Sequence, residues 1–285
     1  MNRRTIFVTS LQLKAHDRDA FESVWPHICA QIEREAAGGA QLIVLPEGTV
    51  PAYVIGKAPL DLNLTERALS DVQNLAQRTG AVIVYGSARM DGTAQRNSAV
   101  VVDSDGTVAG FADKAFLWHF DRQWFTAATH CKPVETSLGP LGVMICADGR
   151  IPTIARTLVD AGAEMLVMPT AWVSSGRDAA SLENVQADLL ARVRARENRV
   201  PFIAANKTGV ERGCVLYCGK SQIVDANGEI VALAPERQAA ALSARVQTSA
   251  PTAARVTPPH APALTVRSKP LRVTIGPQAT PLAAE

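Results

Sequence analysis

The chain has 285 residues, of which 47% are apolar, and this is enough to build the continuous core of one large domain. Its 29 basic residues nearly balance its 27 acidic residues, so the formal net charge of +2 creates no broad field that would collect nucleic acid or an anionic membrane. We therefore expect a small-molecule partner, and neither nucleic acid nor a membrane as a partner.

Apolar runs bounded by turn residues predict the strands. In chain order they cover residues 5–13, 41–46, 81–88, 97–106, 141–146, 164–169, 201–206, 221–228 and 229–234. Amphipathic stretches with helical spacing lie between several of these runs, at residues 19–37, 64–78, 151–161 and 180–198. The turn sequences DSDG (103–106) and DANG (225–228) separate neighbouring strands and predict antiparallel pairs. The pattern indicates a mixed α/β fold and fits a doubly wound parallel sheet less well.

The composition changes after about Gln247, where Ala, Pro, Thr and Val become dominant through to Glu285. Such a segment is usually flexible or extended. We therefore expect one domain over residues 1–247 and a C-terminal tail over residues 248–285.

Three short motifs with apolar flanks carry a glutamate, a lysine and a cysteine: VLPEG around Glu47, ADKAFLW around Lys114 and GVMICADGR around Cys146. The runs 41–46 and 141–145 predict buried strands that end where Glu47 and Cys146 begin, and strand ends are where open α/β folds usually place function. Burial there raises the proton affinity of Glu47 toward that of a base, and a helix N-terminus after Cys146 favours the thiolate. A packed cysteine or a solvated glutamate is the simpler interpretation of either residue alone, but the combination favours a catalytic site.

With these motifs in this order, the sequence resembles the nitrilase superfamily of carbon-nitrogen hydrolases, whose signature is a Glu-Lys-Cys triad. The resemblance covers Thr5 to about Leu242. It implies an α-β-β-α sandwich of two mixed sheets, with a catalytic triad of Glu47, Lys114 and Cys146. It also implies acyl transfer through a thioester, with Lys114 and the backbone N–H of Ala147 at the oxyanion and no metal or organic cofactor.

Further residues match the family pattern. Asp121 lies where the family has a second glutamate that positions the triad, and its shorter side chain leaves that supporting role open. Asp148 and Arg150 match the acidic and basic positions that follow the nucleophile, and we expect them to hold its turn by charge-assisted hydrogen bonds. Residues 97–99 and 194–198 also resemble family positions.

The substrate is weakly encoded. Ala147 and Asp148 after the cysteine are similar to the amidase and carbamoylase branches, whereas nitrile-hydrolysing relatives tend to carry Trp-Glu there. We favour a small amide, with an N-carbamoyl amino acid or a nitrile as alternatives. Gly149 replaces the first of two arginines that carbamoylases use for the substrate carboxylate, although Arg122 or Arg177 could serve. Candidate pocket walls, for which core packing is an equal alternative, are Tyr53, Trp118, His119 and Trp172.

Other classes of function fit less well. Residues 213–221 look like a phosphate loop, but five residues separate Gly213 from Gly219 where that motif needs four, and the segment runs into a strand. The spacing of His119, His130 and Cys131 fits no standard metal site. A non-catalytic assembly protein with the same fold remains an alternative, although it would be expected to carry a broken triad. Transfer of the acyl group to an amine or hydroxylamine would use the same residues as hydrolysis.

Cysteine usage and the termini complete the prediction. An odd number of cysteines at spacings unlike a disulfide framework or a zinc ribbon indicates reduced thiols: Cys29, Cys131, Cys146, Cys214 and Cys218. The residues after Arg4 are too short and polar for a secretion signal, and no run approaches the roughly 20 apolar residues of a membrane span. We expect a soluble, cytoplasmic protein. In relatives a C-terminal extension often crosses a neighbouring subunit, which implies a homo-oligomer, a dimer or higher. A docking arm over residues 248–285 is the alternative to a flexible or extended tail.

Overall fold

The larger of two sheets contains the N-terminal strand at its centre. The structure, a computed structural model, describes residues 3–56, 59–119, 121–174 and 182–249. The strands of this sheet are β1 (Thr5–Lys14), β2 (Leu42–Val44), β3 (Val82–Asp91), β4 (Ala94–Val102), β5 (Val108–Asp113), β9 (Lys207–Glu211), β10 (Val215–Cys218) and β13 (Ala240–Gln247). Their order is β10-β9-β1-β2-β3-β4-β5, and β13 pairs antiparallel with β1. Both parallel and antiparallel pairs occur, so the sheet is mixed.

The second sheet is smaller and also mixed. Its strands are β6 (Leu141–Val143), β7 (Met165–Pro169), β8 (Phe202–Ala205), β11 (Gln222–Val224) and β12 (Ile230–Leu233). The order is β12-β11-β8-β7-β6, with β6, β7 and β8 parallel and the other two strands antiparallel. As the turn sequences predict, DSDG joins the antiparallel pair β4 and β5, and DANG joins β11 and β12.

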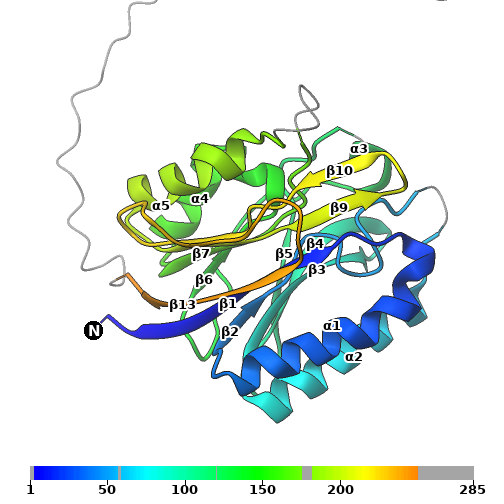
Figure 1. The fold of residues 1–285 in the computed structure, drawn as a ribbon, viewed down its shortest axis with the longest axis horizontal. Coiled ribbons are helices and arrows are strands. Elements are labelled where there is room, and N and C mark those ends of the chain that lie inside the picture. The colour runs from blue at the N-terminus through cyan, green and yellow to red at the C-terminus, as the bar shows by residue number, and fades with distance from the viewer. Residues whose placement is uncertain (1–2, 57–58, 120, 175–181, 250–285) are drawn as a thin grey trace, which may run out of the picture. The chain divides into compact units, whose positions relative to one another are not determined.

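Helices cover the outer faces of both sheets (Figure 1). Their bounds are α1 (Phe21–Ala37), α2 (Leu62–Thr79), α3 (Asp121–Trp124), α4 (Pro152–Asp160) and α5 (Ala191–Asn198), with 3-10 turns at Arg18–Ala20 and Cys146–Arg150 and a π-helical turn at Gln186–Leu190. Helices α1 and α2 lie along one side of the sandwich, and α4 and α5 lie on the opposite side. This arrangement confirms the predicted α-β-β-α sandwich. No helix in the described part of the chain is long and apolar enough to cross a membrane.

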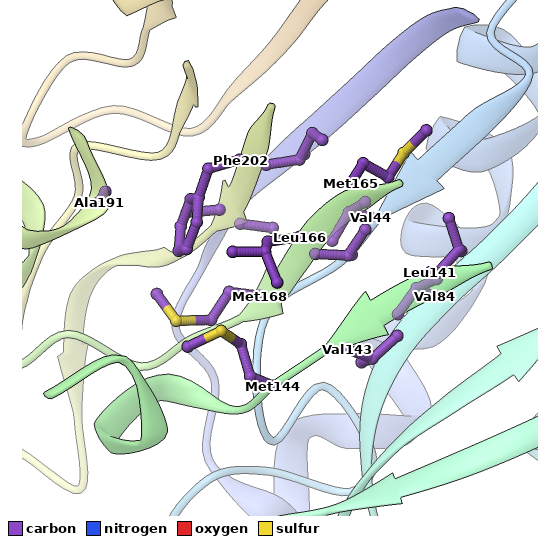
Figure 2. Packing of buried hydrophobic residues seen from close by; sticks show 14 of the residues in the cluster. Val44, Val84, Leu141, Val143, Met144, Met165, Leu166, Met168, Ala191 and Phe202 are labelled. Carbon is purple, nitrogen blue, oxygen red and sulfur yellow. The ribbon is translucent and has the colours of Figure 1, made fainter. Parts of the chain in front are cut away.

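The core between the sheets is built from alternate residues of the facing strands. Val44 and Val84 of the larger sheet belong to the same buried cluster as Val143, Leu166 and Phe202 of the smaller one (Figure 2). The intervening residues of β2 and β3 belong to a second cluster, formed with α1 and α2. Because successive side chains of a strand point to opposite faces, one apolar strand supplies both cores. Each fully buried aliphatic side chain contributes roughly 1.5–3 kcal/mol.

Several predicted boundaries were wrong. Strands β2 and β6 end at Val44 and Val143. A short extended link therefore lies between β2 and Glu47, and another lies between β6 and Cys146. Three strands were not predicted: β9, β10 and β13; the DSDG turn predicts a strand at β5 but not its bounds. Regular α-helix covers only Ala191–Asn198 of the predicted 180–198, because Gln186–Leu190 form a π-helical turn. Before that turn, the side chain of Asn184 accepts a hydrogen bond from the N–H of Gln186 (2.9 Å). Residues 180–181 lie outside the described residues.

The last described residues are tied to the start of the chain. Beyond β13, the N–H of Thr248 donates to the carbonyl of Arg4 (2.8 Å), and the N–H of Ser249 donates to that of Glu164 (3.0 Å). The predicted docking arm lies outside the described residues from position 250 onward, as does Arg177.

Candidate active site

Glu47 is held in a turn after β2, with no exposed surface. One carboxylate oxygen, Oε1, accepts hydrogen bonds from Asn97 Nδ2 and Lys114 Nζ, each at 2.7 Å. The other oxygen, Oε2, is buried and has no hydrogen-bond partner among the described residues. Gly86 on β3 lets the turn approach, because a Cβ at that position would lie 2.5 Å from the Cα of Glu47. Glu47 is thus fixed through one oxygen and leaves the other available.

Lys114 follows β5 and is buried between two carboxylates. Its ammonium also donates to Asp121 Oδ2 at 2.5 Å, and Asp121 accepts further hydrogen bonds from the N–H of Trp118 (3.1 Å) and the hydroxyl of Tyr53 (3.3 Å). Burial alone lowers the pKa of Lys114, but the charges around it, Glu47 foremost, outweigh burial and leave the pKa above its usual range. The lysine therefore stays charged, and the shorter Asp121 side chain reaches it.

Cys146 lies at a backbone bend that few residues adopt. Its φ is 44°, a left-handed value that costs free energy for a residue with a side chain and is often found at functional sites. It opens the 3-10 turn Cys146–Arg150, and it is only 5% exposed. The next residue, Ala147, is buried in the same turn. The structure thus has the sharp junction after β6 that the sequence predicts.

The surroundings of the Cys146 thiol act against the thiolate, in the direction opposite to that of a helix N-terminus. Burial raises the pKa of Cys146 to about 12, and the negative charge of Glu47 raises it further. Lys114, the hydroxyl of Thr170 and the backbone N–H of Ala171 all act in the opposite direction without offsetting burial. The 3-10 turn has only five residues, so its dipole is too small to reverse the effect of burial on the pKa of the thiol. Thiolate formation at neutral pH therefore needs a base.

The pKa of the Glu47 carboxyl is shifted in the direction that a base needs. Burial raises the pKa of its carboxyl, Lys114 lowers it, and the neighbouring carboxylate of Asp121 raises it again, with a net upward shift. This is the direction that burial at a strand end predicts. The negative charge of Glu47 raises the pKa of Cys146, so the two residues form one electrostatic unit.

The turn after Cys146 is joined to the Lys114 segment through Asp148. Its carboxylate accepts three backbone N–H groups, from Ala115 (3.1 Å), Phe116 (2.7 Å) and Ile145 (2.9 Å). Burial raises the pKa of Asp148 to about 6 despite these hydrogen bonds, which lower it. The nucleophile turn and the segment carrying Lys114 are therefore fixed relative to one another.

Arg150 contacts an aromatic ring. Its guanidinium lies 5.3 Å from the centre of the Trp118 ring, and its buried Nε has no hydrogen-bond partner in the described part of the chain. The end of the turn is held instead by Arg194 on α5, whose Nε donates to the carbonyl of Gly149 (3.0 Å). Arg194 lies in a segment that matches the family, but its contact with the turn could not be predicted from sequence.

The four candidate pocket residues differ in their surroundings. Tyr53 is buried and reaches Asp121 through its hydroxyl. Trp118 is half-buried and packs against the exposed His119 at 5.2 Å between ring centres. Trp172 is buried in the inter-sheet core, and its indole N–H has no hydrogen-bond partner among residues that the structure describes. A role as pocket walls remains a prediction for all four.

Two residues at the site were not predicted. Asn97 holds Glu47 through its side-chain amide, and Thr170 accepts the backbone N–H of Glu47 through its carbonyl (3.3 Å). Both are polar residues in or directly after apolar strands. That position could have indicated a role at the site, because a buried polar side chain needs a hydrogen-bond partner. The segment 213–221 forms part of the hairpin of β9 and β10, and no strand-loop-helix phosphate loop is present there. The described residues contain no group of three His, Cys, Asp or Glu that could hold a metal ion.

Replacing Glu47 with glutamine tests the electrostatic unit directly. Because the glutamate charge raises the pKa of the thiol, we expect Glu47→Gln to lower the pKa of Cys146 by at least about one unit. The measurement is the rate of Cys146 alkylation by iodoacetamide as a function of pH, read by peptide mass spectrometry. Glu164→Gln, which removes a carboxylate bound to Arg4, is the control and should leave the midpoint unchanged. An unchanged or higher midpoint in Glu47→Gln would contradict the coupling.

Known proteins match this chain over most of its length. The family model for carbon-nitrogen hydrolase matches residues 7–255. An N-carbamoylputrescine amidase of Arabidopsis thaliana is 29% identical over 85% of this chain and 87% of its own. A nitrilase of Pyrococcus abyssi is 30% identical over 73% of this chain and 77% of its own.

A solved structure extends the comparison to the fold. A variant of the amidase from Nesterenkonia sp. AN1, in which a glutamate is replaced by glutamine, superimposes with a TM-score of 0.76, covering 87% of this chain and 91% of that one at 22% identity. That protein carries the acetamide moiety of fluoroacetamide covalently on its active-site cysteine. The chain belongs to the carbon-nitrogen hydrolase family, which is the nitrilase superfamily that its motifs resemble.

Proposed function

We propose that the protein hydrolyses a small non-peptide amide through a thioester on Cys146. The observation that carries the proposal is a buried Glu47 with one unpartnered carboxylate oxygen, electrostatically coupled to a thiol that needs a base. Lys114 supplies a permanent positive charge in the same place. Together these are a base, a nucleophile and an electrostatic stabiliser for an oxyanion.

In the first step Glu47 takes the proton of the Cys146 thiol while the sulfur attacks the amide carbon. A C–S bond forms, and the carbonyl π electrons move to oxygen. Lys114 and the N–H of Ala147 stabilise this oxyanion, each such donor contributing roughly 3–4 kcal/mol. The C–N bond then breaks, and the nitrogen leaves as ammonia or an amine with the proton held by Glu47.

In the second step water hydrolyses the thioester. Glu47 accepts a proton from the water as its oxygen attacks the acyl carbon, the C–S bond breaks, and the sulfur recovers the proton from Glu47. The carboxylic acid is released, and every proton moves through one carboxylate. Asp121 does not transfer a proton in this scheme, but keeps Lys114 in place.

Relatives support an amide over the other substrates. The Arabidopsis relative is named for a carbamoyl amine, and the Nesterenkonia structure shows an acyl moiety on its cysteine. The Pyrococcus relative is named a nitrilase, so a nitrile and an N-carbamoyl amino acid remain alternative substrates. An assembly protein without activity and acyl transfer to an amine are further outcomes of the test. A homo-oligomer and a cytoplasmic location complete the proposal.

The test uses the intact protein and a panel of small amides, carbamoyl amines, carbamoyl amino acids and nitriles. Ammonia release is followed together with intact mass and peptide mapping. We expect an acyl adduct on Cys146 and ammonia from at least one amide. Cys29 is the internal control, because burial also raises the pKa of its thiol to about 12 and it lies in α1, away from Glu47. Absence of ammonia and of an adduct, with Cys146 labelled by iodoacetamide no faster than Cys29, would favour the assembly protein.

A further inference from the structure

A second buried ion pair lies behind the candidate site. Lys207 and Glu211 are the first and last residues of β9, are 1% and 0% exposed, and approach to 3.2 Å between Nζ and Oε2. Isolated buried ion pairs seldom add stability, because the loss of hydration offsets the attraction between the charges. A buried ion pair can instead serve to hold the neighbouring backbone in one conformation.

Both members of the pair hold the segment that follows Glu47. Lys207 Nζ donates to the carbonyl of Gly48 at 2.8 Å, directly after the candidate base. Glu211 Oε1 accepts the N–H of Val54 at 2.6 Å. The ion pair therefore holds residues 48–54 at both ends, from a strand far away in the sequence.

This segment is tightly folded and leads back to the site. A Cβ at Gly48 would lie 2.4 Å from the Cα of Tyr53, so the two residues are in backbone contact. The hydroxyl of Tyr53 donates to Asp121, which holds Lys114. The Lys207 ammonium lies 6.0 Å from the centre of the Tyr53 ring. Movement of Gly48 would thus disturb Glu47 on one side. On the other side it would disturb the contact of Tyr53 with Asp121, which holds Lys114.

The pair is itself rigidly seated. The hydroxyl of Tyr217 donates to Glu211 Oε2 at 2.7 Å, and the ring of Tyr217 lies 5.5 Å from Lys207 Nζ and packs edge-on to Tyr53. Every polar atom of the pair thus has a fixed neighbour.

We propose that Lys207, with Glu211 as its counter-ion, is a positioning residue that fixes Glu47 for proton transfer from Cys146. The inference rests on the proposed function, because it assigns the base to Glu47. Lys207 does not touch the reacting atoms in this scheme. Its effect is on the orientation of Glu47, where small displacements have large effects on rate.

The first readout is alkylation of Cys146 by 2-chloroacetamide. The sulfur attacks the CH2 carbon, a C–S bond forms, the C–Cl bond breaks to release chloride, and Glu47 takes the thiol proton. In Lys207→Met we expect the Cys146 rate, relative to Cys29 in the same sample, to fall at least about tenfold at neutral pH. For an amide that the wild type hydrolyses, kcat should fall by a similar factor with KM within about twofold, because binding groups are unchanged.

Two further variants separate positioning from folding. Lys220→Met is the matched control, since Lys220 is also largely buried and pairs with Asp188 (2.8 Å) and Glu236 (3.3 Å), away from residues 48–54. It should lower Tm but leave both rates within about twofold of wild type. Lys207→Met/Glu211→Gln removes both charges of the pair and keeps a side-chain oxygen that can accept the N–H of Val54. If Lys207→Met alone fails to fold, we expect this double variant to regain stability, because no unpaired buried charge remains. Its alkylation rate and kcat should stay low.

The outcomes are distinct. If the wild type labels Cys146 no faster than Cys29 and releases no ammonia, the proposed function fails and this inference fails with it. If the wild type is active and either folded Lys207 variant retains wild-type rates, only the positioning role is overturned. Equal losses in Lys220→Met and Lys207→Met would also overturn it, because the effect would then be a general loss of stability.

Discussion

Cys146→Ala is expected to abolish ammonia release and adduct formation while the protein remains folded. Loss of the nucleophile removes the thioester route entirely, and comparable losses in enzymes with an activated nucleophile are on the order of 10⁴ to 10⁶ in kcat. The structural cost should be small, since one buried sulfur is removed and a strained residue becomes smaller. Ammonia release under steady-state conditions and intact mass after incubation with substrate measure the two effects.

Cys218→Ala is the matched control for this substitution. Cys218 is completely buried, and its thiol pKa is also raised to about 12, chiefly by burial. It is not part of the proposed machinery, so turnover should stay near that of the wild type while Tm changes by a similar amount. A Cys146→Ala protein that still releases ammonia would show that the thioester mechanism is wrong, whatever the substrate.

Lys114→Met is expected to reduce kcat by about 10²- to 10³-fold or more. The ammonium is the charged oxyanion donor in the proposed mechanism, and removing one such donor costs roughly 3–4 kcal/mol of transition-state stabilisation. The same change leaves the carboxylates of Glu47 and Asp121 buried without their shared counter-ion. Breaking a buried ion pair in this way costs about 3–5 kcal/mol of stability, so Tm should fall strongly as well.

Lys114→Met/Asp121→Asn separates the two effects. Removing the charge of Asp121 relieves the repulsion with Glu47, and the double variant should therefore regain part of the lost Tm. Its kcat should remain low, because no positive charge returns to the oxyanion. A double variant that folds and keeps more than about a tenth of wild-type kcat would rule out Lys114 as the principal oxyanion stabiliser.

The fold was largely predictable where strands are continuously apolar, as in the runs that became β2, β3, β7 and β8. Their residues are buried on both faces, so each run contrasts sharply with its flanks. Strand β9 was missed because its sequence, KTGVE, has one apolar side chain, Val210, and begins and ends with the charged Lys207 and Glu211. Sequence shows the charges but not that each is compensated by the other inside the protein. Strand β13 was missed because half of its side chains are exposed and its stability depends on pairing with β1.

The residues of the candidate site could be predicted where they lie in a recognisable motif. Glu47, Lys114 and Cys146 each occur in a recognisable segment; Lys114 donates a hydrogen bond to Glu47, and both charges act on the pKa of Cys146. The sequence predicts that a helix N-terminus favours the Cys146 thiolate, but burial acts on the pKa of the thiol in the opposite direction, and the extent of burial is not visible in a local motif. The contacts of Asn97, Asp148 and Arg194 depend on the approach of segments distant in sequence, and no local pattern contains that information.

Strand β1 has a consequence for synthesis of the chain. Thr5 lies opposite Gln247 in the β1 and β13 pair, and Leu13 lies beside Lys207 in the β1 and β9 pair. Strand β1 is synthesised first, but its hydrogen bonds are complete only after β9 and β13 have been synthesised. Contacts with such large sequence separation slow folding and expose an apolar strand edge in the meantime. We expect a nascent chain truncated before residue 207 to need protection from aggregation, because its larger sheet still lacks β9, β10 and β13.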